Sequence, residues 1–250
     1  MKIHIISPQK FNPRTLEFYR TFAEEVSFDE AEVIVTQLDE VKTDREVIVA
    51  TNCTGLDHIK APNAKIFSLR GEDLSTFTAV SELVLWAILE MIRKRANQEL
   101  RGKTLSIIGD GRIGQHVRLR SESFGIRVLS FDKGEPMENL KDILKESDIV
   151  ILSITADEEN RNFMDRGKFE MMKDGAWFLN SARPWLVEEN ALKWALESGK
   201  IKGAWSDFRV NFSHPNLLIT DHRGGSTSYS LERSQLLIAK RVKQYAKRSI

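Results

Sequence analysis

Residues 101–132 read RGKTLSIIGDGRIGQHVRLRSESFGIRVLSFD, and this stretch contains the pattern that decides the fold. An apolar run is followed directly by Gly109, Gly111 and Gly114 in the spacing G-x-G-x-x-G, and then by a helical segment. The first glycine permits a tight turn, the second lets the backbone approach a pyrophosphate, and the third allows close packing of helix on sheet. The helix start offers unpaired N–H groups and a positive dipole end to phosphates. The stretch therefore predicts a strand, turn and helix that bind a dinucleotide.

A second apolar run after this helix ends at Asp132, about 20 residues beyond Gly111, where a ribose-binding carboxylate belongs. Two like charges at roughly 4 Å and an effective dielectric constant of ~20 repel by about 4 kcal/mol, so Asp132 disfavours a 2′-phosphate. The sequence thus predicts NAD rather than NADP as the cofactor. Lys133, the next residue, leaves NADP open as the alternative.

The composition limits the classes of protein to consider. With 250 residues, 41% of them hydrophobic, the chain can form one large or two modest domains. The formal net charge of +1 gives no reason to expect nucleic acid or a membrane as a partner. The single cysteine, Cys53, excludes an internal disulfide, and the start MKIHIISPQK lacks the apolar core of a signal peptide. We therefore expect a soluble cytoplasmic protein.

Short β-branched runs alternate with helical patterns along the whole chain, which predicts an α/β fold with parallel sheets. A polar stretch at 93–101 is the expected hinge between two domains. The expected strands are 2–7, 32–36, 46–50, 65–69, 105–108, 128–131, 149–154, 176–180, 202–208 and 217–220. The expected helices are 15–26, 79–95, 112–124, 137–146, 167–172, 187–198 and 228–248.

Two residues match the needs of hydride transfer to a bound nicotinamide. Arg183 follows an expected strand and precedes Pro184, which favours an extended conformation at Arg183. Its guanidinium can hold a carboxylate in bidentate fashion, although a surface charge is the alternative. His222 follows another expected strand, and a histidine can donate and accept a proton near neutral pH. The other four histidines have no comparable setting, and no metal site is expected.

Five ordered segments together resemble the D-2-hydroxyacid dehydrogenase family, which includes phosphoglycerate, glycerate and formate dehydrogenases. AVSELVLWAILEMIRK is similar to the family's helix before the cofactor domain, and LRGKTLSIIGDGRIG to the entry into that domain. NCTGLDHI resembles the loop whose amides receive the substrate carboxylate. FLNSARPWLVEENAL and ITDHRGGST resemble the catalytic-arginine and catalytic-histidine segments.

The resemblance implies two Rossmann-like, doubly wound parallel-sheet domains with a cleft between them. Residues 1–95 with 227–250 would form a flavodoxin-like substrate-binding domain, and 96–226 an NAD-binding Rossmann domain. The implied activity is NAD-dependent hydride transfer between NAD(H) and a small D-2-hydroxy or 2-oxo acid. The resemblance implies that Arg183 binds and polarises the substrate and that His222 is the acid/base catalyst. Among the cofactor contacts, Asp132 would bind the adenosine ribose, Arg112 and Ile113 the pyrophosphate, and Asp207 the nicotinamide carboxamide. Thr54 and Gly55 would offer their amides to the substrate carboxylate.

The chain also departs from the family pattern. The family places a glutamate a few residues after the position of Asp207, where it pairs with the histidine, but here Phe208 to Phe212 contain no carboxylate. Asp207 and Asp221 are the alternative partners, yet neighbouring side chains of an extended segment point to opposite faces, which counts against Asp221. The missing glutamate leaves a second function open, that of an NAD(H)-binding sensor or interaction protein with weak catalysis.

Three further features bear on substrate and assembly. Pro184 replaces a usual glycine after the arginine. The stretch between the expected helix 79–95 and Leu105 is much shorter than in relatives, where it helps to build the dimer, so a homodimer is expected without a defined geometry. Arg70 is a candidate for meeting a phosphate or second carboxylate of the substrate, with a solvated surface arginine as the alternative.

Overall fold

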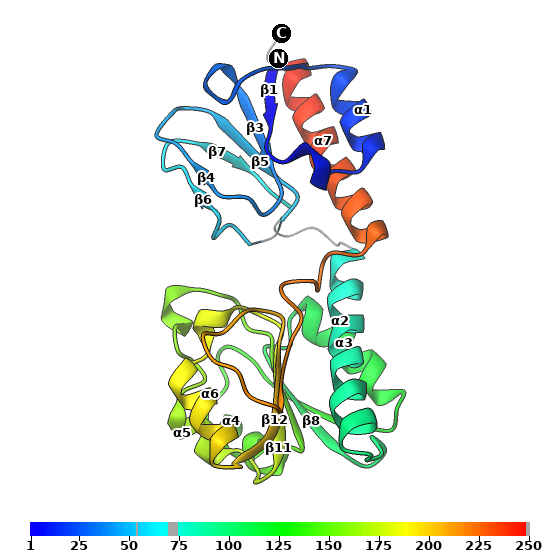
Figure 1. Cartoon of the computed structure of the whole chain (residues 1–250), viewed down its shortest axis with the longest axis vertical. Helices are drawn as coiled ribbons and strands as arrows, with labels where there is room; N and C mark the ends of the chain where they lie inside the picture. Colours follow the sequence, from blue (N-terminus) through cyan, green and yellow to red (C-terminus); the bar gives the residue numbers. More distant parts are fainter. Residues whose placement is uncertain (54, 70–74, 249–250) are drawn as a thin grey trace. The chain divides into compact units, whose positions relative to one another are not determined.

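The computed structural model describes residues 1–53, 55–69 and 75–248. The chain divides into two compact units, one comprising Met1–Thr76 with Ser226–Ile250 and the other Phe77–Gly225 (Figure 1). Each unit has its own sheet, and every strand pairing among the described residues is parallel. The predicted α/β class with Rossmann-like parallel sheets is therefore confirmed.

The first unit contains a five-stranded sheet in the order β2-β1-β3-β5-β7 and a separate pair, β4-β6. Its helices α1 and α7 pack against each other, which brings the end of the chain back onto its beginning (Figure 1). The strands are β1 Lys2–Ile5, β2 Glu24–Glu25, β3 Val33–Thr36, β4 Val41–Lys42, β5 Ile48–Thr51, β6 Ile59–Lys60 and β7 Lys65–Phe67. The helices are α1 Pro13–Arg20 and α7 Ser228–Arg248, with short 3-10 helices at Pro8–Lys10 and Phe28–Glu30.

The second unit contains a six-stranded sheet in the order β13-β12-β11-β10-β8-β9. The strands are β8 Thr104–Ile108, β9 Arg127–Phe131, β10 Ile149–Leu152, β11 Ala176–Asn180, β12 Ile201–Ser206 and β13 Leu217–Ile219. The helices are α2 Ser75–Ile88, which starts just before the unit, α3 Arg112–Glu122, α4 Met137–Glu146, α5 Arg166–Met171 and α6 Glu189–Glu197. A π-helical turn, Leu89–Arg95, continues α2, and 3-10 helices occur at Glu158–Asn160 and Pro184–Leu186.

The period of two along a strand distributes the core of the second unit over both faces of its sheet. In β10, Val150 and Leu152 pack with residues of α4, α5 and α6. Ile149 and Ile151, the alternate positions, pack on the opposite face with residues of α2 and α3. Because both faces are covered by helices, the strand is apolar at every position, as expected for a doubly wound sheet.

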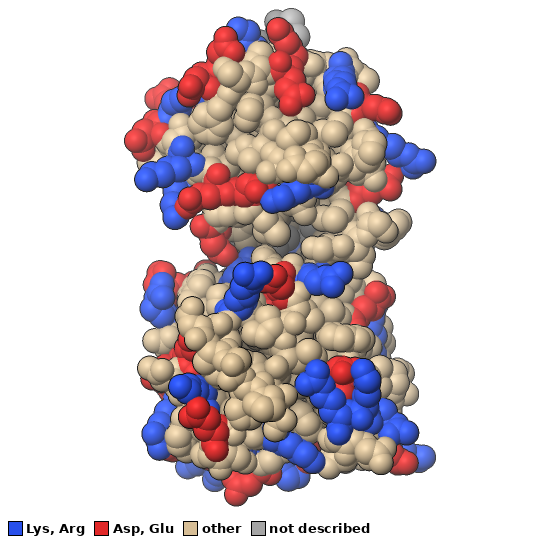
Figure 2. Space-filling model, viewed as in Figure 1, with Lys and Arg blue, Asp and Glu red and all other residues tan. Residues whose placement is uncertain are grey.

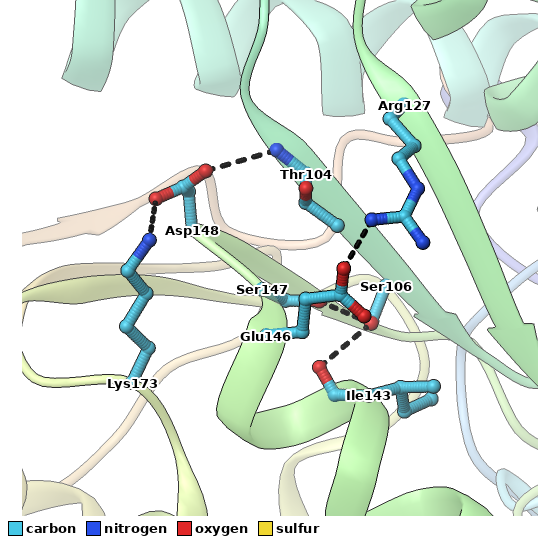
Figure 3. A network of polar contacts seen from close by, with 8 residues as sticks. All are labelled: Thr104, Ser106, Arg127, Ile143, Glu146, Ser147, Asp148 and Lys173. Carbon is cyan, nitrogen blue, oxygen red and sulfur yellow. Dashed lines mark hydrogen bonds and ion pairs between the residues drawn. The ribbon is translucent and has the colours of Figure 1, made fainter.

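Polar contacts occur at the amino ends of three strands in the second unit (Figure 3). Asp148, just before β10, accepts hydrogen bonds from the Thr104 amide at 2.9 Å and from Lys173 Nζ at 2.7 Å. Arg127 at the start of β9 pairs with Glu146 at the end of α4. These contacts lie at the amino ends of the strands, whereas the glycine turn follows the carboxyl end of β8.

Two expectations about elements are wrong in an informative way. The expected helix 15–26 ends at Arg20, and Glu24–Glu25 instead pair with β1 as an edge strand. The expected helix 79–95 begins at Ser75 and changes to π-helical geometry after Ile88. In addition, Val84, Ala87 and Ile88 pack in the core of the second unit. The first boundary between units falls between Thr76 and Phe77, in the first turn of α2, whereas the sequence places it after residue 95.

Acidic and basic side chains are interleaved on the face of the molecule seen in Figure 2. This agrees with the balance of 37 Lys and Arg against 36 Asp and Glu in the sequence. Of the helices in the described ranges, none has the length and apolar character needed to cross a bilayer.

Candidate functional site

The glycine turn lies between β8 and α3 and is tightly enclosed on one side. Gly109 has φ +96°, and a Cβ there would lie 2.7 Å from the carbonyl carbon and oxygen of Ser153. Its N–H donates to Phe131 O at 2.8 Å. A glycine is thus required at 109 both by the positive φ and by the backbone of Ser153, which follows β10.

The other two glycines differ from each other. A Cβ at Gly114 would lie 2.6 Å from Gly109 O and 3.0 Å from Ile107 Cγ2, so this glycine lets α3 approach β8. A Cβ at Gly111 would meet nothing within 4 Å, and its φ of −72° is open to any residue. Nothing in the described protein around Gly111 therefore demands a glycine. The open space is what a pyrophosphate needs, because the backbone can approach it closely there.

The start of α3 has the properties of a phosphate site. Gly111 is the N-cap, and as a glycine it has no side chain to cap the first amides of the helix. The Asp110 carboxylate, which would lie near a phosphate, is paired with Arg118 at 2.5 Å. The guanidinium of Arg112 lies 4.7 Å from the centre of the Phe77 ring, and Ile113 packs partly against the core. The turn thus presents the amino-terminal end of α3 beside an acid paired with an arginine, a combination that fits an anionic cofactor.

Asp132 lies exposed just beyond β9, which is the neighbour of β8 in the sheet. Its Oδ1 accepts from the amide of Lys133 at 2.8 Å, and its own amide donates to Glu135 Oε1 at 2.9 Å. Because β8 and β9 are parallel, Asp132 and the glycine turn follow strands that end at the same edge of the sheet. A dinucleotide with its phosphates at the turn has its adenosine ribose at this edge.

Arg183 follows β11 and has an extended backbone, with φ −151° and ψ 150°, as its place before Pro184 predicts. Asn180, the last residue of β11, holds this segment. Its Nδ2 donates to Arg183 O at 2.9 Å and its Oδ1 accepts from the Ala182 amide at 3.0 Å. The Arg183 side chain donates to Ala182 O at 2.8 Å. The backbone that carries the guanidinium is therefore fixed by a buried side chain.

Asp207, directly after β12, is buried at 4% exposure and holds the segment that carries His222. Its Oδ1 accepts from Thr220 Oγ1 at 2.7 Å and from the Arg223 amide at 2.8 Å, and its Oδ2 accepts from the Gly224 amide at 2.8 Å. Its main-chain oxygen also accepts from the His222 amide. These contacts make Asp207 the anchor of the 220–224 loop.

The segment at His222 is not extended, in contrast to the sequence-based expectation. Asp221 and His222 both have φ +59°, a left-handed conformation that is uncommon for residues other than glycine. Asp207 imposes this tight turn by collecting two successive amides of the loop. The argument that neighbouring side chains of an extended segment diverge therefore does not apply to Asp221 and His222.

Of the two alternative carboxylates, Asp221 forms a two-pronged ion pair with Arg209, with Nε to Oδ1 at 2.6 Å and Nη2 to Oδ2 at 2.7 Å. The hydrogen bonds from Arg209 lower the pKa of the Asp221 carboxyl below its ordinary value. Asp207 is already the acceptor for the loop. Both carboxylates thus have structural partners of their own, and Arg209, in the segment after Asp207, is the partner of Asp221.

Phe208 is a site residue that sequence reasoning missed. It follows β12, the strand between β11 and β13, and its ring is in contact with both Arg183 and His222. The distance between Arg183 Cζ and the ring centre is 5.6 Å, and that between the two ring centres of Phe208 and His222 is 4.7 Å. The only sequence signal was its position directly after Asp207.

The first unit contributes the expected substrate loop after β5. Thr54 lies outside the described residues, and so does Arg70. Before Thr54, the Cys53 thiol donates to Gln37 O at 2.9 Å and the Cys53 amide donates to Thr51 Oγ1 at 3.2 Å. Gly55, on the other side, is partly exposed. Within the described ranges, no group of three or more His, Cys, Asp and Glu is arranged to hold a metal ion.

The fold and the glycine turn define the second unit as a dinucleotide-binding domain. The comparison with known families assigns this domain to a family. Residues 85–224 match the model described as D-isomer specific 2-hydroxyacid dehydrogenase, NAD binding domain. The chain belongs to this family, as its sequence resemblance predicted, and its cofactor is NAD.

Two relatives illustrate the similarity. The D-3-phosphoglycerate dehydrogenase of Haemophilus influenzae is 29% identical over 236 residues, which cover 79% of this chain and 57% of the relative. The hydroxypyruvate reductase of Thermotoga maritima is 29% identical over 232 residues, which cover 78% of this chain and 76% of the relative. The chain spans about half the length of several curated relatives, for example 51% of D-3-phosphoglycerate dehydrogenase 1 of Saccharomyces cerevisiae.

Solved structures share the fold over nearly the whole chain. The D-lactate dehydrogenase from Aquifex aeolicus, complexed with NAD and lactic acid, has a TM-score of 0.81 and 22% identity, covering 99% of this chain and 96% of that one. A glyoxylate reductase from Paecilomyes thermophila has a TM-score of 0.81 and 20% identity, covering 100% and 96%. At these identities the likeness shows a shared fold and nothing beyond it.

Proposed function

We propose that the chain is an NAD-dependent oxidoreductase that transfers hydride between NAD(H) and a small D-2-hydroxy or 2-oxo acid. One observation carries the proposal. Arg183 and His222 follow two strands of the NAD-binding unit, and both contact the ring of Phe208 at the edge where the glycine turn lies. An arginine and a histidine placed together beside a nicotinamide domain are the groups that reduction of a 2-oxo acid needs. The names of the relatives, among them hydroxypyruvate reductase, support the same substrate class.

The roles follow from the chemistry of each side chain. When bound, NADH supplies a hydride to the carbonyl carbon of the substrate. The Arg183 guanidinium holds the substrate carboxylate and polarises the adjacent carbonyl, which a planar fork does better than an ammonium. His222 donates a proton to the carbonyl oxygen, so that the product is the neutral hydroxyl and the imidazole is left neutral; oxidation runs in reverse.

The remaining site residues bind the reactants in this proposal. The amides at Gly111, Arg112 and Ile113 receive the pyrophosphate, and Asp132 accepts hydrogen bonds from the adenosine ribose. A 2′-phosphate would meet the Asp132 charge, so NADH is preferred to NADPH despite Lys133. The amide of Gly55, in the first unit, is proposed to receive the substrate carboxylate together with that of Thr54, which lies outside the described residues.

Asp207 is proposed to reach the nicotinamide carboxamide in addition to its loop contacts. A carboxylate offers about four acceptor positions, and its protein contacts use three.

The test is a panel of 2-oxo acids, comprising hydroxypyruvate, glyoxylate, pyruvate and 3-phosphohydroxypyruvate, with NADH absorbance as the readout. Arg183→Lys and His222→Gln should each lower kcat/KM by about 100-fold, equivalent to about 2.7 kcal/mol of transition-state stabilisation. Arg127→Lys and His214→Gln, at other places in the same unit, serve as controls and should stay within about twofold. Variants at 183 and 222 that keep wild-type efficiency would refute the assigned roles.

A second candidate function is an NAD(H)-binding sensor with weak or no catalysis. The segment Arg209 to Phe212, which contains no acid where the family has a glutamate, favours it. The same panel separates the two functions. Tight NADH binding measured by fluorescence, without turnover of any of the four acids, would establish the sensor and exclude the enzyme.

We further propose a cytoplasmic homodimer. Large apolar side chains are exposed on the second unit, including Trp86 at 43% and Leu119 at 70%, and a second copy of the chain could cover them. Light scattering on the purified protein gives the mass, and a monomer at micromolar concentration would refute the dimer. Fractionation of the source cell tests the location.

A further inference from the structure

Phe208 is nearly buried, at 8% exposure, yet it borders the two side chains to which the reaction is assigned. The Arg183 guanidinium lies over its ring at 5.6 Å from the centre. The His222 imidazole lies at 4.7 Å between ring centres, with the two planes inclined by 47°. One flat side chain is therefore shared by the arginine and the histidine.

We propose that Phe208 is a positioning residue for the reaction, whose ring sets the separation and orientation of Arg183 and His222. The inference rests on the function proposed above. Phe208 does not react with the substrate or the cofactor. It acts through the two catalytic side chains, because the guanidinium and the imidazole both contact its ring.

The backbone of Phe208 is itself held in place. Ser206 Oγ donates to Phe208 O at 2.9 Å and accepts from the Phe208 amide at 3.1 Å, so one buried hydroxyl binds both main-chain groups. The preceding amide, that of Asp207, donates to Asn180 O at 3.2 Å. The residue that carries the ring is thereby tied to the ends of β12 and β11. A phenylalanine side chain has only two rotatable bonds, so little freedom remains.

Asn180 and Asp207, which tie the Phe208 segment to β11, also hold the main chain of the two catalytic residues. Asn180 fixes the carbonyl of Arg183, and Asp207 fixes the amides that follow His222. These hydrogen bonds place the backbones, and the Arg183 side chain also donates to Ala182 O at 2.8 Å. The Phe208 ring adds a contact common to both side chains, through its negative face, which attracts the guanidinium, and through its inclined contact with the imidazole.

The proposal predicts a specific pattern of sensitivity. A displacement of about 1 Å between reacting groups can cost on the order of 100-fold in rate, even when the fold is intact. Leucine fills much of the volume of phenylalanine but lacks the flat face. Tyrosine retains the flat face. Loss of the ring should therefore reduce the rate more than it reduces stability.

The experiment compares the wild-type protein with Phe208→Leu, Phe208→Tyr and a matched control, Phe169→Leu. Phe169 is also buried in the second unit and loses an aromatic contact of the same kind, with Phe178 at 5.1 Å. Steady-state kcat and KM are measured with the best acid of the panel, together with the NADH dissociation constant and Tm.

We expect Phe208→Leu to lower kcat by at least 10-fold and to raise KM for the acid, with the NADH dissociation constant within about twofold. Phe208→Tyr should restore most of the rate, and Phe169→Leu should keep it even if its Tm falls further. The proposal is overturned if the two leucine variants have the same kcat, or if tyrosine fails to restore it.

A second readout does not depend on turnover. The imidazole proton resonances of His222, assigned by their loss in His222→Gln, should shift in Phe208→Leu because the ring current of Phe208 is removed, and should stay in place in Phe169→Leu. A wild-type protein that reduces no acid contradicts the proposed function. Unshifted His222 resonances contradict the placement of the ring, whatever the activity.

Discussion

The contrast between Gly111 and Gly114 allows cofactor binding to be separated from folding. Both belong to the same glycine turn, but only a Cβ at Gly114 collides with the protein. We predict that Gly111→Ala loses NADH affinity with little change in stability, whereas Gly114→Ala loses stability as well. The pair tests whether the open side of the turn is the place of the pyrophosphate.

The magnitudes follow from the local geometry. At Gly111, alanine is a poorer N-cap by about 0.5–1 kcal/mol, but it restricts the unfolded chain by a similar amount at an allowed φ, so the net change is close to zero. At Gly114 the contact with Gly109 O at 2.6 Å is backbone, which cannot give way easily, and overpacking costs about 2–3 kcal/mol. Helix propensity returns up to about 1 kcal/mol. The net loss of about 1–2 kcal/mol corresponds to a Tm lower by about 2–8 °C.

The assay is thermal unfolding without cofactor, combined with NADH titration by fluorescence. For Gly111→Ala we expect an unchanged Tm and an affinity reduced tenfold or more, which is about 1.4 kcal/mol of binding free energy. An alanine at 111 that leaves the NADH dissociation constant unchanged would refute the placement of the pyrophosphate. Equal Tm losses in the two variants would refute the packing argument.

Three further predictions concern single carboxylates. Asp207→Asn should destabilise the protein by about 1–3 kcal/mol in urea unfolding and reduce activity, because an amide nitrogen would face the Gly224 or Arg223 amide; an unchanged midpoint would contradict this. For Asp148, partial burial alone raises the pKa, but hydrogen bonds from Lys173 and the Thr104 amide and the nearby lysines lower it overall. Its stabilisation, about 1 kcal/mol after allowance for solvent screening, is present above the unfolded pKa of about 3.9 and is lost as pH falls below it. The stability difference between wild type and Asp148→Asn should therefore shrink in acid, and a constant difference from pH ~6 to ~3 would contradict the assignment. Asp132→Ser should raise the affinity for NADPH relative to NADH, and an unchanged ratio would argue against a ribose contact.

Much of the NAD-binding unit could be predicted because its signals are local. The glycine spacing, the strand before it and the acid after the next strand all lie within residues 101–132. Each reports a constraint between near neighbours, such as the approach of Gly114 to Gly109. The resemblance then extended this reading to the class of enzyme.

The loop that carries His222 could not be predicted because its shape is set by distant residues. Nothing around Asp221 in the sequence announces a left-handed conformation, and the residues there are not glycine. The conformation depends on Asp207, which is buried under the loop and binds its amides. Likewise, the contact of Phe208 with both Arg183 and His222 requires three strands to be in order.

The structure divides the chain after Thr76 and not after residue 95, for a related reason. The polar stretch 93–101 is a genuine change in composition, but composition does not tell which core the preceding helix joins. Val84, Ala87 and Ile88 pack with β8, β10 and β11 strand residues of the second unit. A hydrophobic stripe on a helix indicates that it is covered, whereas the covering sheet is known only from the fold.

Asn180 has a practical consequence for reading mutational data on this chain. Asn180 is buried, at 3% exposure, so it cannot meet the substrate directly. Its hydrogen bonds to Ala182 and Arg183 hold the segment after β11, and its bond from the Asp207 amide holds the segment after β12. In a saturation screen scored by growth or by product, substitutions at Asn180 will rank beside those at Arg183 and resemble active-site hits. Screens scored in parallel for NADH retention and for protein abundance will separate such internal supports from the groups that meet the substrate.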